Sequence, residues 1–277
     1  MKLSLILTFL AFVASSAFAV EAPLVSAKSA LLLDANTGKV LYKKNENEQR
    51  PVASTQKLLT ALIVAESGGL SEDVTIAEPD TNCEPTKLYL KPGQSYPRSQ
   101  LLRALLVKSA NDVARALARD NAGSIPEFAG RMNEWMSRLG GTNSNFVNPN
   151  GLPSPEQYSC ARDMARVARA AYRNPTLREI MAIRYYPFRY ESGKTVTLKN
   201  TNRVLRFYTF CNGMKTGYTD RAGHCLISSG SYKGRDVIAV VLGSTKARIW
   251  DESARLLAYG LGISPSQMGS LRIRGAE

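Results

Sequence analysis

Two residues near the start of an expected helix are spaced for nucleophilic chemistry. Ser54 and Lys57 lie three positions apart at the beginning of residues 52–66, where leucine, isoleucine and alanine recur at helical spacing. Residues i and i+3 share one face of a helix, so the Lys57 amine can reach the Ser54 hydroxyl and take its proton. The positive end of the helix dipole would favour negative charge developing there. Taken alone, the pattern also fits a serine that caps a helix beside a surface lysine.

A second pair of polar residues interrupts an apolar segment. Ser109 and Asn111 flank one alanine within residues 101–120, a segment rich in leucine and alanine that is predicted to be helical. Burying either side chain without a partner would cost about 1–3 kcal/mol. These two residues therefore either cap a local turn or line a wet cleft.

Three consecutive residues in a strand-like run are suited to bind an anion. Lys215 supplies positive charge, Thr216 can donate a hydrogen bond to a carboxylate, and Gly217 leaves the strand backbone open to a ligand. The alternative is an edge-strand lysine next to a turn glycine. None of the three motifs is specific by itself, so their combination carries the argument.

The elements that would position these motifs change in type along the chain. Residues 29–33 and 40–42 are strand-like, flank turn-forming residues and predict a hairpin. The predicted helices are residues 52–66, 101–120, 128–139, 161–172 and 250–259, and the later strands are residues 184–190, 195–198, 214–219, 225–228 and 237–242. We therefore expect an α/β protein of the α+β type. Its antiparallel sheet of about five strands from both chain ends would be flanked by helices and carry an inserted all-helical lobe.

The first residues have the features of a secretory signal peptide. Lys2 precedes an apolar run, and small residues at positions 17 and 19 provide a cleavage signal after Ala19. No later stretch reaches 18 apolar residues, so we expect no spanning helix and no stable membrane anchor. The expected organisation is a signal peptide at residues 1–19, one catalytic domain at residues 20–262 and a short polar tail at residues 263–277.

Charge and composition restrict the binding partners. The 277 residues include 36 Lys and Arg against 23 Asp and Glu, which gives a formal charge of +13. The basic residues are spread out and are not interleaved with aromatic residues, so we expect no nucleic-acid partner. A single histidine, His224, excludes a His-rich metal site, and we expect no metal and no cofactor.

Export would permit disulfide bonds between the four cysteines. Cys211 and Cys225 flank a predicted hairpin centred near Tyr218, which makes them a candidate pair and would leave Cys83 for Cys160. The alternative is four buried thiols.

Following an export signal, the three motifs together resemble the Ser-x-x-Lys, Ser-x-Asn and Lys-Thr-Gly set of penicillin-binding proteins and serine β-lactamases. The chain is most similar to the low-molecular-mass D-alanyl-D-alanine carboxypeptidases, between about residues 29 and 262. The stretches that carry this resemblance are residues 53–61, 90–93, 108–112, 158–165 and 213–223. The resemblance implies the serine β-lactamase/penicillin-binding-protein transpeptidase-like fold.

The resemblance also implies a mechanism in peptidoglycan synthesis, and with it a part in cell shape. Ser54 would attack the bond between the last two D-alanines of a stem pentapeptide, and water would then release the acyl-enzyme. Lys57 would be the base, and burial and the charge of Lys215 would both lower its pKa. Ser109 and Asn111 would relay protons and bind the substrate.

The remaining roles follow from the same resemblance. The backbone N–H groups of Ser54 and Tyr218 would form the oxyanion hole. Lys215, Thr216, Gly217 and Arg248 would hold the terminal carboxylate. Penicillins and other β-lactam antibiotics would acylate Ser54 as covalent inhibitors, and the enzyme would act in the periplasm or on the cell-wall side of the cytoplasmic membrane.

Three other functions are compatible with a site of this kind. A D,D-endopeptidase would cut peptidoglycan cross-links with this site, and the difference would lie in the rim of the cleft. A serine β-lactamase of class A needs a placed glutamate, but the loop at residues 148–157 has only Glu156, next to a proline. A non-catalytic cell-wall binding protein is disfavoured because all three motifs are intact.

Overall fold

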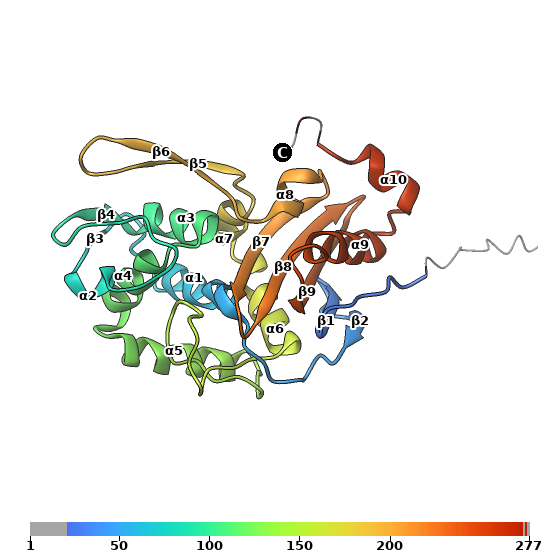
Figure 1. Ribbon diagram of the computed structural model, residues 1–277, viewed down its shortest axis with the longest axis horizontal. Helices are drawn as coiled ribbons and strands as arrows, with labels where there is room; N and C mark the ends of the chain where they lie inside the picture. The colour runs from blue at the N-terminus through green and yellow to red at the C-terminus, as the bar shows by residue number, and fades with distance from the viewer. Residues whose placement is uncertain (1–20, 274, 276–277) are drawn as a thin grey trace, which may run out of the picture.

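The computed structural model describes residues 21–273 and residue 275 of the chain. A five-stranded antiparallel sheet is built from the two ends of this part of the chain, in the order β2-β1-β9-β8-β7 (Figure 1). Its strands are β1 (Ser29–Asp34), β2 (Val40–Lys44), β7 (Cys211–Thr219), β8 (Gly223–Tyr232) and β9 (Arg235–Ser244). The predicted fold class and the five-stranded sheet are therefore confirmed.

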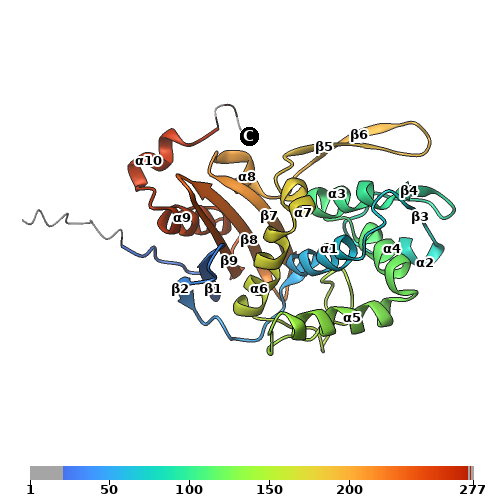
Figure 2. The same ribbon diagram turned by 180° about the vertical axis from the view of Figure 1, so that it is seen from behind.

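Both faces of the sheet are buried, because the middle residues of β1 and β9 are apolar on both sides. In β1, Leu31 and Leu33 join one hydrophobic cluster, while Ala30 and Leu32 join the other. Helix α9 (Ile249–Leu261) covers the second cluster, as Figure 1 shows, and α6 (Ala161–Arg173) covers the opposite face, as Figure 2 shows. A strand buried on both faces reads as a continuous apolar run, as β1 and β9 do.

A helical lobe lies beside the sheet and is built around α1 (Lys57–Glu66). Eight consecutive residues of α1, Lys57 to Val64, are buried, as expected for a helix surrounded by others. The other elements of the lobe are α2 (Glu78–Thr81), α3 (Arg98–Lys108), α4 (Asn111–Ala122), α5 (Ile125–Arg138), α7 (Pro175–Met181) and the two-stranded ribbons β3 (Asp73–Thr75) with β4 (Ser95–Pro97) and β5 (Tyr185–Arg189) with β6 (Thr195–Lys199). The lobe is therefore not all-helical, because short ribbons extend from it.

The predicted helix at residues 101–120 is two helices. Ser109 has a φ of +68° and ends α3, and α4 begins at Asn111. The left-handed conformation at Ser109 cannot continue a helix. Apolar residues occur at helical spacing on both sides of the break, which is why the periodicity shows one helix where there are two.

The β7–β8 hairpin shows that the predicted Cys211–Cys225 disulfide is wrong. The turn lies at residues 220–222 rather than near Tyr218, so Cys225 pairs with Gly217 and Cys211 pairs with Gly230. The six positions between Cys211 and Gly217 correspond to about 20 Å along a strand, far beyond the reach of a disulfide. All four cysteines are free and buried.

The two ends of the sequence compare differently with the predictions. The predicted signal peptide, residues 1–19, lies outside the described residues. The expected polar tail contains a short helix, α10 (Pro265–Ser270), whose Met268 packs against the α9 side of the core. One further helix, α8 (Arg203–Phe207), precedes β7. None of the helices at residues 21–273 is long and apolar enough to cross a membrane.

The buried thiols give a test of the fold. Burial raises the pKa of Cys211 to about 12 and that of Cys225 to about 11, so little thiolate forms at neutral pH. Protein purified without reductant from an oxidising compartment should show no rapid reaction with a thiol reagent while native and four reactive thiols after denaturation. Two or fewer thiols in the denatured, unreduced protein would show that a disulfide had formed.

Candidate active site

Ser54 lies on a single 3-10 turn, η1 (Ala53–Gln56), that leads directly into α1. Its hydroxyl oxygen is 2.9 Å from the Nζ atom of Lys57, the first residue of the helix. Lys57 is completely buried. The i to i+3 spacing thus brings the two groups together as the sequence predicts.

Two further oxygens hold the Lys57 amine in place. Its Nζ atom donates to Asn111 Oδ1 at 2.7 Å and to the Asn150 carbonyl at 2.6 Å. Asn111 Nδ2 donates to the Glu84 carbonyl at 3.0 Å, which fixes the orientation of its amide. Both oxygens near Lys57 can only accept. A neutral amine would give them its two N–H groups and keep its lone pair for the Ser54 hydroxyl, which is the arrangement a general base requires.

The electrostatics favour the neutral amine. Burial lowers the pKa of Lys57 well below that of a free lysine, and the like charge of Lys215 lowers it further. Burial also lowers the pKa of Lys215 to about 7. Burial lowers the pKa of both amines, and the pKa of Lys57 is lowered further in the presence of the Lys215 charge, so Lys57 is the first of the two to lose its proton as the pH rises.

The Ser-x-Asn motif occupies the break between α3 and α4. Because Ser109 ends one helix and Asn111 starts the next, the chain turns sharply and aims Asn111 at the start of α1. The Ser109 hydroxyl forms no hydrogen bond within the described part of the chain, and the residue is 8% exposed. Both interpretations of this motif, a local turn and the lining of a wet cleft, are consistent with this geometry.

Strand β7 passes against η1. A Cβ atom on Gly217 would lie 2.9 Å from the backbone nitrogens of Ser54 and Thr55, closer than real Cβ contacts. Glycine at this position therefore lets the strand approach the nucleophile. Lys215 is completely buried and donates to the Thr216 carbonyl at 2.9 Å, while the Thr216 hydroxyl meets that of Thr201 at 2.7 Å.

An open pocket of about 360 Å³ gives access to Ser54 and Asn111, while Lys57, Ser109, Lys215 and Thr216 are not among the described residues that line it. It is lined by Ser54, Asn111, Tyr218 and Arg221, together with Pro85, Thr86, Gly151, Leu152, Pro153, Thr219 and Asp220. Arg248 is not among the described residues of this lining. It is exposed and precedes α9, where its backbone N–H donates to the Thr245 carbonyl.

Sequence reasoning missed three residues that build the site. Asn150 supplies a carbonyl to Lys57 and donates its side-chain amide to the Asn111 carbonyl, and Gly151 approaches Ala53 so closely that a Cβ would be 2.1 Å from the Ala53 oxygen. Asp112, 1% exposed, accepts the backbone N–H groups of Leu88 and Leu90. The asparagine, proline and glycine residues at positions 148–155 predict an irregular loop. They do not predict that this loop contacts the start of α1.

Comparison with known proteins agrees with this geometry. Residues 16–246 match the D-alanyl-D-alanine carboxypeptidase family, Peptidase S11. The chain is 35% identical over 224 residues to D-alanyl-D-alanine carboxypeptidase DacF of Bacillus subtilis, covering 79% of this chain and 58% of that protein. It is 33% identical to DacB2 of Mycobacterium tuberculosis, covering 88% of this chain and 86% of that protein.

A solved structure shares the fold over nearly the whole chain. The crystal structure of the Streptomyces K15 DD-transpeptidase matches with a TM-score of 0.82 and 29% identity, covering 88% of this chain and 100% of that one. The described chain thus has the two-lobed architecture of a known D,D-peptidase and spans little more than half of the Bacillus relative. By the extent of its family match, this chain belongs to the D-alanyl-D-alanine carboxypeptidase family, Peptidase S11.

Proposed function

We propose that this protein is a serine D-alanyl-D-alanine carboxypeptidase that removes the terminal D-alanine from peptidoglycan stem pentapeptides. The observation that carries the proposal is the buried Lys57 amine, whose two acceptor-only neighbours leave its lone pair for the Ser54 hydroxyl 2.9 Å away. An amine held in this way activates a serine without a histidine. His224 packs its ring against Tyr218, with ring centroids 4.4 Å apart, and is not needed for the reaction.

Acylation then proceeds by proton transfer within the pocket. As the bond from Ser54 Oγ to the substrate carbonyl forms, Lys57 takes the hydroxyl proton. The proton is returned to the nitrogen of the departing D-alanine when the peptide bond breaks, and we assign its relay to the Ser109 hydroxyl. A water molecule then attacks the ester carbonyl of the acyl-enzyme by the same proton transfers. The bond to Ser54 Oγ breaks, which releases the shortened peptide and restores the Ser54 hydroxyl.

The oxyanion of the tetrahedral intermediate is assigned to the backbone N–H groups of Ser54 and Tyr218. The close approach of β7 to η1 at Gly217 supports this assignment, because it brings the two backbones to the same side of the nucleophile. Loss of one such donor costs roughly 100-fold or more in rate.

The terminal carboxylate of the substrate is assigned to Lys215 and Thr216, because the charge of Lys215 is close enough to lower the pKa of Lys57. Arg221 lines the pocket and adds a second positive charge. The exposed position of Arg248 makes it a weaker candidate for this role than the resemblance implies.

Release of a bound penicillin should be slow. Asp220 is the only carboxylate among the described residues that line the pocket, and its oxygen accepts the Tyr218 hydroxyl at 2.8 Å. This arrangement supports a penicillin-binding peptidase over a β-lactamase. The signal-peptide features of residues 1–19 support a site of action in the periplasm or on the cell-wall side of the cytoplasmic membrane.

The first test is the product formed from a diacyl peptide ending in D-Ala-D-Ala. Mass spectrometry should show loss of one alanine and, in Ser54→Ala, no product although the variant remains folded. Cleavage of cross-linked dimers alone would support the endopeptidase instead. Rapid turnover of a labelled penicillin, rather than its retention on Ser54, would support the β-lactamase.

Gly217→Ala should disable the site without unfolding the protein. The new Cβ would force β7 away from the Ser54 backbone, and acylation by labelled penicillin should slow by about 100-fold or more. Gly130→Ala is the matched control, because this glycine lies within α5 with open space around it. The control should retain acylation and gain about 0.5–1 kcal/mol of stability. Equal acylation by both variants would contradict the assigned oxyanion hole.

The two lysines should give acylation a bell-shaped pH profile. The second-order rate constant should fall on the acid side as Lys57 gains a proton, and above pH 7 as Lys215 loses one, by about tenfold per pH unit well above its pKa. In Lys215→Arg the guanidinium stays charged, so the alkaline limb should disappear in any variant that remains folded. A wild-type rate constant that rises steadily to pH 10 would show that Lys57 titrates like a free lysine.

A further inference from the structure

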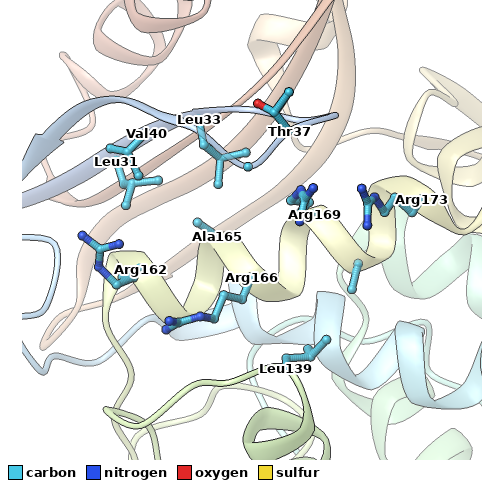
Figure 3. A pocket seen from close by; sticks show the side chains of 12 residues that line it. Leu31, Leu33, Thr37, Val40, Leu139, Arg162, Ala165, Arg166, Arg169 and Arg173 are labelled. Carbon is cyan, nitrogen blue, oxygen red and sulfur yellow. The ribbon is translucent and has the colours of Figure 1, made fainter.

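A second cavity, of about 460 Å³, shares no lining residue with the catalytic pocket. It lies between α6 and the β1–β2 hairpin (Figure 3). Its volume falls within the range of small-molecule sites, about 300–1,000 Å³. Nothing in the proposed peptidase mechanism uses it.

The cavity has one charged side and one apolar side. Arg162, Arg166, Arg169 and Arg173 line it from α6, while its apolar lining is formed by Leu31, Leu33, Val40, Leu139, Ala165 and Ala170. Figure 3 shows the side chains of Arg162, Arg169 and Arg173 directed toward the hairpin that carries the leucines. No acidic residue is among the described residues of this lining.

Two of the four guanidinium groups are already neutralised and two are not. Arg162 pairs with Glu46 at 2.9 Å and Arg166 with Asp163 at 2.7 Å. Within residues 21–273, by contrast, Arg169 and Arg173 form no ion pair. Their hydrogen bonds go to backbone carbonyls, and both donate to the Asn36 carbonyl, at 2.6 Å and 3.0 Å. Two positive charges one helical turn apart therefore have no direct ion pair, and Asp34 is a nearby carboxylate whose pKa the charge of Arg169 helps to lower.

The free guanidinium groups are also held in position. Arg169 donates to the Ala35 carbonyl at 3.0 Å as well as to that of Asn36. Gly38 makes room for it, because a Cβ atom there would lie 3.1 Å from Arg169 Cζ. A side chain fixed before binding loses less entropy when a ligand arrives. The hairpin loop thus orients the arginine toward the cavity.

We propose that this cavity, which we call the α6 pocket, binds a phosphate monoester attached to an apolar body. A phosphate monoester carries about −1.5 to −2 charges at neutral pH, which matches the two unpaired guanidinium groups, and its oxygens accept from two arginines at once. A carboxylate can also accept from two arginines, but its single negative charge would neutralise only one of them. Val40 and Leu139, which are half-buried and line the cavity, then contact the apolar part of the ligand, and free phosphate would leave them uncovered.

The test uses dihexanoyl phosphatidate, below its micelle concentration, as the probe in calorimetry with the whole protein. Arg169→Gln/Arg173→Gln should weaken binding by at least about tenfold. The matched control, Arg138→Gln/Arg255→Gln, removes the same charge from exposed arginines outside the α6 pocket and should bind as wild type does. Arg169→Gln/Arg173→Gln loses the hydrogen bonds to the Ala35 and Asn36 carbonyls and should melt at a lower temperature than the control. Both double variants should keep the wild-type rate of acylation by penicillin, which separates this proposal from the proposed catalysis and shows that both variants are folded.

Further probes examine the two halves of the ligand. Inorganic phosphate should bind more weakly than the amphiphile, and Val40→Ala should weaken only the amphiphile. Binding of dihexanoyl phosphatidylcholine with equal affinity, equal weakening by both double variants, or no binding of phosphatidate at millimolar concentration would each overturn the proposal.

Vesicles of phosphatidylcholine with and without phosphatidate identify the source of the ligand. Sedimentation with the phosphatidate vesicles that is lost in Arg169→Gln/Arg173→Gln would support a lipid headgroup. Binding of the soluble amphiphile alone would support a free phosphorylated molecule.

Discussion

The burial of one amine at the start of α1 is the constraint on which the catalytic site depends. Removing Lys57 from water favours its uncharged form, and a buried amine must still have partners for its N–H groups. Two residues provide these partners. Asn111 lies at the break between α3 and α4, and Asn150 lies in a loop 93 residues after Lys57. The fold of the helical lobe therefore brings Asn111 Oδ1 and the Asn150 carbonyl oxygen to the Lys57 Nζ atom.

Lys215 limits how this constraint can be met. A second buried amine in the same site would be costly if both were charged, and the two differ because repulsion lowers the pKa of Lys57 further. The sheet and the lobe thus contribute one lysine each, and Lys57 loses its proton at a lower pH than Lys215 does. Their junction, where β7 touches η1 at Gly217, sets how closely the strand that carries Lys215 approaches the start of α1.

Much of this arrangement could be predicted from the sequence, and the failures have physical reasons. The i to i+3 spacing of Ser54 and Lys57 is a local property, so their contact was predictable. The break at Ser109 was not, since apolar periodicity continues through it and the left-handed turn is stabilised by contacts from elsewhere. The hairpin was predicted but not its register, and a shift of the turn by a few residues was enough to separate Cys211 from Cys225. Asn150 could not be assigned, because its partner in space is remote in sequence.

The order of the sheet leaves two edge strands that face different risks. An exposed edge offers unpaired backbone groups to any extended chain and invites aggregation. The β2 edge carries Lys43 and Lys44, and the Lys43 side chain is 64% exposed, so charge protects that side. At the other edge, η1 packs on one face of β7 at Gly217, and access near Ser54 is through the pocket. The unpaired backbone groups of the β7 edge therefore lie close to the serine, where an extended chain can pair with them.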